Sequence, residues 1–173
     1  MGQVIDFGAA TWDRDKHAEI IQTRHYRAPE VVLDNGWSHA ADIWSIGCIL
    51  MELYESRLMF ETHDSGEHLA MMERVVDRIP ESMARSCGPS ARCFFDRHRE
   101  LRWPDIALSD RSVRKVHRLP TLKDRISRED AEMGFLAAIQ GMLTMSPAKR
   151  LTATQLLALP FFLQGDKTRE RHD

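Results

Sequence analysis

The sequence has 173 residues, of which 43% are hydrophobic and 29% are charged, and a formal net charge of -2 at pH 7. These values are typical of one globular unit with a buried core, and they exclude a strongly basic chain drawn as a whole to nucleic acid or to an acidic membrane. An odd number of cysteines without a C-x-x-C pair favours reduced thiols over a disulfide framework. The longest apolar stretch, residues 43–54, is too short to cross a bilayer, so we expect a soluble intracellular protein without a membrane partner.

The N-terminal part begins with a short candidate strand at residues 3–5. Residues 9–27 lack clear periodicity and are predicted to form a long loop, which in a compact domain usually has a function or is disordered. Pro29 is well placed at the first position of a short helix that follows the loop.

Residues 42–55 form the most distinctive predicted helix, because apolar side chains cover nearly its whole circumference. Such a helix belongs in the middle of a core and packs on several sides. Asp42 is predicted to cap its start, since a carboxylate can accept hydrogen bonds from free N–H groups there.

A second helix is predicted at residues 65–77, followed by an irregular stretch at 80–126 with a strand-like patch at 93–95. A capping-box-like start at Ser127 precedes another helix. Its predicted apolar stripe consists of Phe135, Leu136, Ile139, Met142 and Leu143.

Near the C-terminus, Thr152 and Gln155 form a capping box, and Pro160 is expected to end the helix that this box begins. Residues 164–173 are polar and are expected to be disordered. We find no internal repeat, and the predicted fold class is mainly α.

Four motifs occur in a fixed order along the chain. They are Asp6-Phe7-Gly8, then Ala28-Pro29-Glu30, then Asp42-x-Trp44-Ser45-x-Gly47, and finally Glu67-His68-Leu69-Ala70-Met71-Met72-Glu73-Arg74. A D-F-G tripeptide alone could be a turn after a strand, but D-F-G and A-P-E in this order are part of the protein-kinase signature. The last motif contains the LAMMER letters in full. The chain therefore resembles the LAMMER-type (Clk-like) dual-specificity kinases of the CMGC group.

The resemblance implies a fold and a division of the chain. We expect the C-terminal (large) lobe portion of the protein-kinase-like fold, with the N-lobe and the catalytic loop missing. Residues 1–163 would be a partial kinase domain, comprising an activation segment at 6–30 and late helices with the CMGC insert at 31–163. Residues 164–173 would be a polar tail.

The resemblance also implies roles at the nucleotide site. Asp6 would hold the magnesium ion that bridges the ATP phosphates, and a carboxylate suits this hard cation. Phe7 would pack beneath the site, and Gly8 would let the backbone swing between active and inactive arrangements. No catalytic base is expected within these residues, because they contain no Gly-rich loop, no Val-Ala-Ile-Lys strand and no His-Arg-Asp segment.

The resemblance also implies roles in the loop that positions protein substrates. The implied substrate-positioning loop includes Thr23, Arg24, Tyr26 and Arg27. Thr23 would contact the catalytic aspartate, and Arg27 would steer the loop or pair with a phosphate on it.

The implied structural residues are Glu30, Asp42 and Arg150. Glu30 and Arg150 would form a buried ion pair that ties the loop's end to the late helices, and Asp42 would hydrogen-bond the catalytic-loop backbone. Removing one partner of such a pair would leave a buried charge without compensation.

Several other features have two interpretations. His63, Glu67 and His68 superficially suggest a metal site, but their spacing is not that of a zincin and favours a solvated helix start. Met71 and Met72 favour core packing over a functional thioether site. The arginine-rich stretch 85–118 could contact RNA, although its acidic residues favour the CMGC insert, so no nucleic-acid partner is expected.

The functional hypothesis is an enzyme fragment. By resemblance, the full-length protein would transfer phosphate from MgATP to Ser, Thr and Tyr, with Arg/Ser-rich splicing factors as substrates and the nucleus as its location. The acidic residues Glu52, Glu55, Glu61, Asp64 and Glu67 are predicted to attract such basic substrates. The alternative is a catalytically dead lobe that acts as a protein-interaction module, and these residues alone are expected to be inactive.

Overall fold

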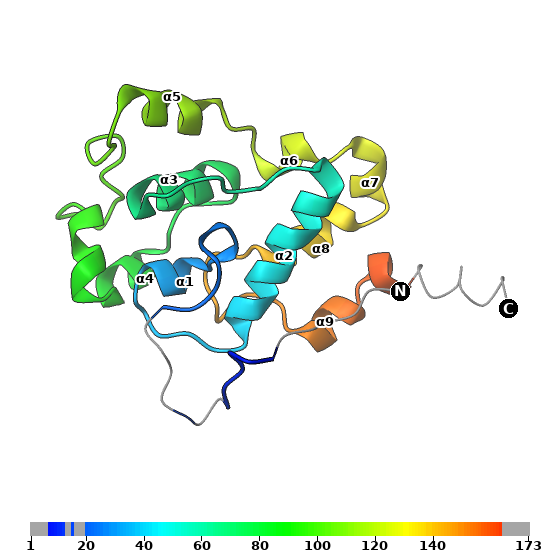
Figure 1. Ribbon diagram of the computed structural model, residues 1–173. Helices are drawn as coiled ribbons and strands as arrows, with labels where there is room; N and C mark the ends of the chain where they lie inside the picture. Colours follow the sequence, from blue (N-terminus) through cyan, green and yellow to red (C-terminus); the bar gives the residue numbers. More distant parts are fainter. Residues whose placement is uncertain (1–6, 13–14, 16–19, 164–173) are drawn as a thin grey trace, which may run out of the picture.

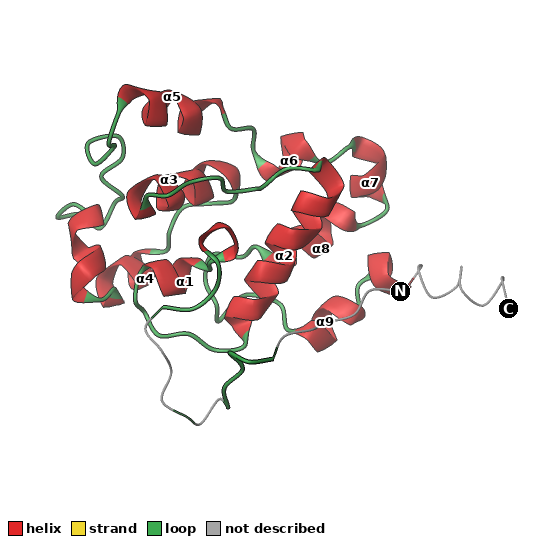
Figure 2. Cartoon of the chain, viewed as in Figure 1, coloured by secondary structure: helices red, strands yellow, loops and turns green. Residues whose placement is uncertain are grey.

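The computed structural model describes residues 7–12, 15 and 20–163, and in this part of the chain the protein is almost entirely helical (Figures 1 and 2). The one β feature among these residues is an isolated antiparallel bridge between Phe95 and Leu101. The helices are α1 (Pro29–Val32), α2 (Ala40–Glu55), α3 (Ser65–Val75), α4 (Glu81–Ser86), α5 (Asp110–Arg118), α6 (Leu122–Arg125), α7 (Arg128–Glu132), α8 (Phe135–Met142) and α9 (Ala153–Leu157), with 3-10 turns η1 (Arg24–Tyr26) and η2 (Pro89–Phe94). The mainly α prediction is confirmed.

Helix α2 runs through the middle of the molecule, as Figure 1 shows, with α3 on one side and α8 on the other. Its start differs from the prediction. The helix begins at Ala40, its N-cap residue is His39, whose side chain makes no capping hydrogen bond, and the N–H of Ala40 donates to Oγ of Ser38 at 3.4 Å. Asp42 lies exposed inside the first turn, so its predicted capping role is wrong, although its charge still opposes the helix dipole.

The core is built on one face of α2. Trp44 is fully buried and stacks on Phe60, with ring centroids 6.2 Å apart. Gly47 faces α8 at close range, since a Cβ atom there would lie 2.9 Å from Cδ2 of Leu143. Glycine at this position therefore lets the two helices approach each other.

The opposite face of α2 is open. Ile46, Ile49 and Leu53 are 45%, 42% and 73% exposed, whereas a helix that is apolar all round was predicted to pack on several sides. Within the described residues nothing covers this face. The sequence pattern is that of a central helix, but the described chain packs against only part of its circumference.

The stretch 80–126 is more regular than predicted. It contains α4, η2, α5 and α6, and the predicted strand at 93–95 is wrong, because residues 93 and 94 belong to η2 and Phe95 forms an isolated bridge only. These elements are four to nine residues long, too short to show a clear period in the sequence.

Local signals correctly place several helix starts. Ser127 accepts a hydrogen bond from the backbone N–H of Asp130, and Thr152 forms a complete capping box with Gln155. The helix predicted after Ser127 is divided in two, because Gly134 adopts a left-handed conformation with φ 94°. Pro160 does not end α9, which stops at Leu157, but opens a final helical turn at 160–163.

Two predictions lie outside the described residues, namely the strand at 3–5 and the disordered tail at 164–173. In the described part of the chain, no helix has both the length and the apolar character that a membrane span would need. The three cysteines are free, and Cys93 is the exposed one.

Candidate functional site: a loop anchored on α2 and the signature helix α3

The loop that precedes α1 is fixed at its end by a buried ion pair. Nη1 and Nη2 of Arg150 lie 2.7 and 2.9 Å from the two carboxylate oxygens of Glu30, and both side chains are at most 1% exposed. Arg150 also donates to the carbonyl oxygens of Ala40 and Thr144, and its guanidinium lies 5.2 Å from the ring centroid of Trp44. The predicted pair is present and joins α1, α2 and the segment after α8.

The side chain of Arg27 forms hydrogen bonds with the backbone of its own loop. Its Nε donates to the carbonyl of Ile21 at 3.1 Å, and its Nη2 donates to that of Gln22 at 3.0 Å. Burial, with a smaller contribution from Arg24, lowers the pKa of this guanidinium. Of the two roles expected for Arg27, the contacts among described residues are those of an arginine that shapes the loop.

Gln22 is an anchor that sequence reasoning missed. It has a left-handed backbone, with φ 65°, and its side chain makes three hydrogen bonds. Its Nε2 donates to the carbonyl of Ala41 at 2.8 Å and to Oγ of Ser45 at 2.7 Å, while its Oε1 accepts from the N–H of Ala28 at 3.0 Å. An isolated glutamine carries no sequence signal for this role.

The middle of the loop rests on the C-terminal half of α2. The hydroxyl of Tyr26 donates to Oε2 of Glu52 at 2.6 Å, and this hydrogen bond raises the pKa of Tyr26. Arg24 donates to Oγ of Ser65 at 3.2 Å, which links the loop to α3. Thr23 is exposed and makes no side-chain cap at η1. The structure therefore brings Arg24, Tyr26 and Arg27 into one anchored loop and leaves Thr23 at its surface.

Helix α3 carries the signature letters, and its apolar members lie in the core. Leu69, Ala70, Met71 and Met72 are at most 3% exposed, as the core interpretation of the two methionines predicts. Asp64 is the N-cap residue of α3, and its carboxylate accepts a hydrogen bond from the N–H of Glu67 at 2.7 Å.

His68 contradicts the prediction of a solvated helix start. It is fully buried, its ring centroid lies 5.4 Å from that of Phe60, and neither ring nitrogen has a hydrogen-bond partner in the described chain. Burial lowers the pKa of His68 to about 3, and the nearby Arg24 and Arg27 act in the same direction. The imidazole is therefore neutral at physiological pH.

The charged members of the signature hold the insert that follows. Glu67 accepts hydrogen bonds from Oγ of Ser112 and, at 2.9 Å, from Nζ of Lys115. Glu73 accepts from the N–H of Ile79 at 2.9 Å, and burial raises its pKa. Nε of Arg74 donates to the carbonyl of Leu119 at 2.9 Å. The apolar residues of the signature therefore pack in the core, and its charged residues form hydrogen bonds with segments between residues 79 and 119.

Comparison with known proteins agrees with this geometry. A family model described as the protein kinase domain matches residues 2–162. The chain belongs to the protein kinase family. It is 46% identical to the serine/threonine-protein kinase AFC3 of Arabidopsis thaliana, 43% to the kinase Doa of Drosophila melanogaster and 45% to the dual specificity protein kinase CLK1 of Mus musculus. These relatives are LAMMER-type, Clk-like kinases, so the predicted branch of the family is confirmed.

The matches extend over most of this chain but over less than half of each relative. In each case 92% of the chain is covered, against 40%, 19% and 32% of the AFC3, Doa and CLK1 kinases. A crystal structure described as a kinase domain superposes with a TM-score of 0.87 at 38% identity, over 92% of this chain and 46% of the other. The predicted fold, a portion of the large kinase lobe, is confirmed.

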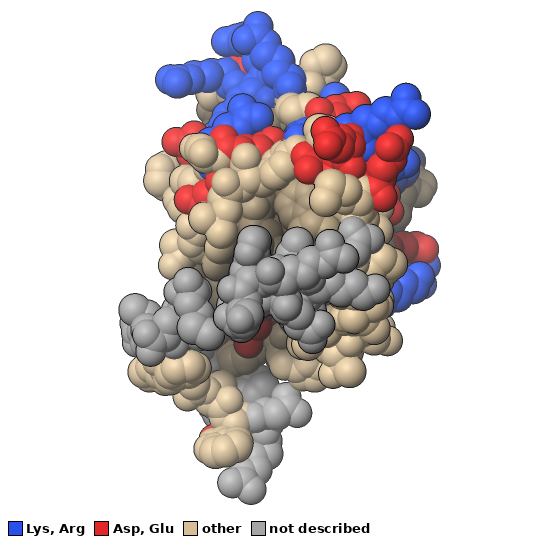
Figure 3. All heavy atoms as spheres, turned by 90° about the vertical axis from the view of Figure 1, so that its right-hand side faces the viewer, with Lys and Arg blue, Asp and Glu red and all other residues tan. Residues whose placement is uncertain are grey.

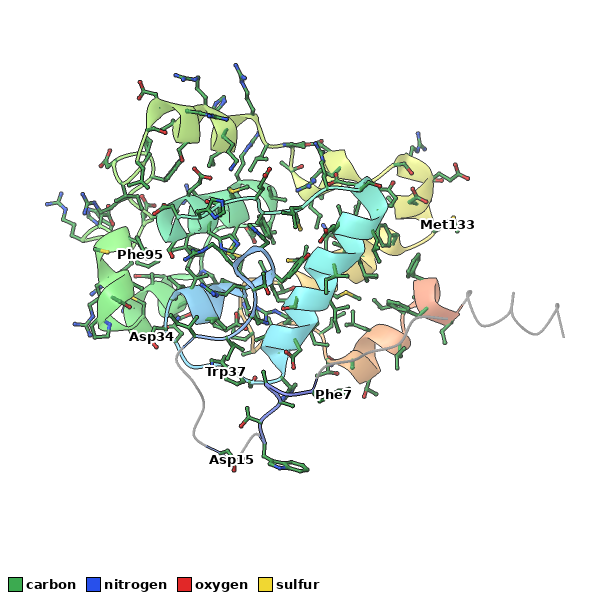
Figure 4. The ribbon with its side chains drawn as sticks, viewed as in Figure 1. Phe7, Asp15, Asp34, Trp37, Phe95 and Met133 are labelled. Atoms are coloured by element: carbon green, nitrogen blue, oxygen red, sulfur yellow. The ribbon has the colours of Figure 1, made fainter. Side chains whose placement is uncertain are left out.

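The nucleotide side of this kinase lobe is only partly described. Asp6, the predicted magnesium ligand, lies outside the described residues. Phe7 is 70% exposed and Gly8 is also exposed in the described chain, and their roles at the nucleotide site stay predictions. Phe7 and Trp37 lie at the N-terminal end of α2, where they help to line a hollow of about 670 Å³ that also includes Asp42 (Figure 4).

The described residues do not by themselves fit a magnesium–nucleotide site. No group of three or more His, Cys, Asp or Glu side chains in the described part of the kinase lobe could hold a metal ion. Among the described residues, Asp42 is the one carboxylate that lines the hollow beside Phe7, and by itself it is too few for a hard cation that also carries phosphates.

Two of the five acidic residues predicted to attract basic substrates are paired within the chain, Glu55 with Arg125 and Glu67 with Lys115. Glu52 accepts a hydrogen bond from the uncharged hydroxyl of Tyr26 and has no cationic partner among the described residues. Asp64 caps α3, while Glu61 is exposed. These partners were not evident from sequence, because they lie 26 to 70 residues away along the chain.

The buried imidazole predicts a pH dependence of stability. Because its folded pKa of about 3 lies below the ordinary value of 6.5, the unfolded chain binds a proton that the folded chain does not when the pH lies between these values. Stability contributed by neutral His68 is therefore present above pH 6.5 and is lost, at roughly 1.4 kcal/mol per pH unit, as the pH falls toward 3. Urea unfolding from pH 7 to 4.5 should show a smaller slope in His68→Phe than in the wild type. An unchanged slope would contradict the assignment.

Proposed function

We propose that this chain supplies the substrate-binding part of a LAMMER-type dual-specificity kinase. The protein to which it contributes would transfer phosphate from MgATP to Ser, Thr and Tyr side chains of Arg/Ser-rich splicing factors in the nucleus. The observation that carries the proposal is the anchored loop between Gln22 and Glu30, which joins the N-terminal end of α2 to the buried pair Glu30–Arg150. A preformed loop binds an extended peptide at a lower entropic cost than a mobile one.

Glu61 and Glu52 provide the charge that such a basic peptide would meet. Glu61 is exposed, and Glu52 is half-buried beside the loop, where it already accepts a hydrogen bond from Tyr26. An arginine approaching this loop would share Glu52 with the tyrosine and could pair directly with Glu61. Exposed pairs of this kind contribute about 0.2–1 kcal/mol each, so the attraction is modest and depends on salt.

Phosphate transfer needs groups that these 173 residues do not contain. ATP and Mg²⁺ are the cofactors used by this family, and one predicted metal ligand, Asp6, is present in the sequence. The lysine that pairs with phosphate and the aspartate that accepts the hydroxyl proton are not in the sequence of this chain. We therefore expect the 173-residue chain to bind peptide without transferring phosphate.

Binding of a fluorescent peptide of Arg-Ser repeats tests the proposal. The chain, fused to a soluble carrier protein, should bind this peptide more tightly than a peptide in which every arginine is glutamine. Glu61→Gln should weaken binding about threefold, and Glu129→Gln, an equally exposed change on α7, should have no effect.

The outcomes separate the proposal from its alternatives. Equal binding of both peptides would reject Arg/Ser-rich substrates. Phosphate transfer from MgATP by the chain alone would show that other residues replace the missing groups. Tight binding of a non-substrate protein without any peptide preference would favour the interaction-module alternative.

A further inference from the structure

Helix α5 presents a row of arginines to solvent. Arg111, Arg114 and Arg118 are exposed, while Ser112 and Val116 on the other side of the helix are buried. At 100° per residue, the three arginines lie within a sector of about 60° of the helix circumference. Figure 3 shows Lys and Arg atoms gathered at the top of the molecule, the edge at which Figure 1 draws α5. We call Arg111, Arg114 and Arg118 the α5 ridge.

The α5 ridge has no acidic partner in the described chain. No hydrogen bond or ion pair joins any of its three guanidinium groups to another described residue, in contrast to Lys115 on the inner side, which pairs with Glu67. Asp110, at the first position, is the one acidic residue of the helix. Two exposed arginines on other helices are paired within their helix, Arg85 with Glu81 and Arg128 with Glu132.

The neighbouring positive charges of the α5 ridge lower the stability of the helix. Like charges three and four residues apart on a helix destabilise it by about 0.2–0.5 kcal/mol per pair, and the ridge contains two such pairs. Arg118, in the last turn, interacts favourably with the helix dipole, but Arg111, in the first turn, opposes it. Asp110, four residues before Arg114, offsets part of this cost, and an anionic ligand from outside the chain would offset the rest.

The spacing of the ridge fits an extended peptide. Arg114 and Arg118 are about 6 Å apart along the helix axis, and Arg111 and Arg118 about 10.5 Å. In an extended chain, alternate residues are about 6.6–6.8 Å apart on one face. Two phosphorylated serines at alternate positions, as in an Arg-Ser repeat, would therefore face Arg114 and Arg118, while Arg111, about 4.5 Å from Arg114 along the axis, adds charge beside them. A guanidinium can bind a phosphate with two parallel hydrogen bonds, which a lysine cannot do.

Other anionic partners fit less well. Single-stranded nucleic acid binds through aromatic side chains on which bases stack, and the exposed face of α5 carries none. A membrane surface is bound by longer basic helices with a large apolar face, whereas α5 is nine residues long and buries its apolar side.

We propose that the α5 ridge binds phosphorylated serines of a substrate segment that the kinase has already modified. The inference rests on the proposed function for the choice of peptide, but the contact it assigns is independent of catalysis. Product phosphates bound at α5 would keep the substrate attached while unmodified residues reach the loop at Arg24–Arg27. The two surfaces are joined, because α5 is held to α3 through Ser112 and Lys115 and the loop is held to α3 through Arg24.

The test compares two labelled peptides of four Arg-Ser repeats, one unmodified and one with every serine phosphorylated. Each is titrated by fluorescence anisotropy against the full chain fused to maltose-binding protein. In the variant Arg111→Gln, Arg114→Gln, Arg118→Gln, affinity for the phosphorylated peptide should fall at least tenfold, whereas affinity for the unmodified peptide should change less than about threefold.

A matched control removes the same charge elsewhere in the insert. Arg92, Arg97 and Arg99 are exposed, and their joint replacement by glutamine should leave binding of the phosphorylated peptide within about twofold of the wild type. Equal losses in both triple variants would overturn the proposal, because they would show a general charge effect. Tighter ridge-dependent binding of a labelled single-stranded RNA than of the phosphorylated peptide would also overturn it.

The same titrations keep the two proposals apart. If the phosphorylated peptide binds through the ridge but the unmodified peptide binds no better than its glutamine analogue, the Arg/Ser substrate class fails and the ridge assignment stands. If the unmodified peptide binds and the ridge variant holds the phosphorylated peptide as tightly as the wild type does, the ridge assignment fails alone.

Discussion

Replacing Glu30 with alanine is expected to lower the free energy of unfolding by about 3–5 kcal/mol, because it leaves Arg150 charged and buried without its partner. The side chain of Arg150 is fully buried, and the contacts that would remain are carbonyl oxygens, from Ala40, Thr144 and Met145, and the face of Trp44. Urea unfolding followed by circular dichroism measures the effect. The loss exceeds that of most single substitutions, and it would also release the end of the substrate-positioning loop.

Two further variants show whether burial is the cause. Arg85→Ala removes an exposed pair with Glu81 and should cost less than about 1 kcal/mol. Replacing Glu30 and Arg150 together by methionine should cost less than Glu30→Ala alone, since no isolated charge remains. If Glu30→Ala cost no more than Arg85→Ala, the buried pair would not be what fixes the loop's end.

The second large effect concerns the open face of α2. We expect the 173-residue chain without a carrier to self-associate and to bind a hydrophobic dye, because Ile46, Ile49 and Leu53 are 42–73% exposed. Burying one such side chain fully is worth about 1.5–3 kcal/mol, and several together approach the whole stability of a small domain. Sedimentation velocity at increasing concentration measures the association.

Polar substitutions on this face should prevent the self-association and lower the dye binding. The triple variant Ile46→Gln, Ile49→Gln, Leu53→Gln should sediment as a monomer with much less dye binding. Leu108→Gln, at an equally exposed leucine far from α2 in the insert, should behave as the wild type does. A monomeric wild type with a sharp two-state melt would show that the face does not drive association.

The sequence predicts best what local chemistry or a long motif determines. The capping residues Ser127 and Thr152 and the Pro29 start of α1 follow from short-range hydrogen bonding and a fixed φ angle. The pair Glu30–Arg150 spans 120 residues and was predicted only because the family resemblance supplies both partners. The family itself was evident from the order of its motifs.

The residues that were missed are those whose role depends on tertiary contacts. Gln22 has no distinctive neighbours in sequence, yet it bridges the loop, α1 and α2. The position of His68 in the first turn of a helix with acidic neighbours predicts a solvated side chain, but that turn is covered by the segment around Phe60. Likewise, Glu52 and Glu55 look free in sequence and are paired by Tyr26 and Arg125 from distant segments.

The proposed function requires that a protein substrate bind at the loop. Amide hydrogen exchange of the carrier fusion, with and without the unmodified Arg-Ser peptide, tests this most directly. Peptide binding should slow exchange at residues 20–30 and at the C-terminal half of α2, beside Glu52. Protection confined to other segments, with residues 20–30 unchanged, would contradict it.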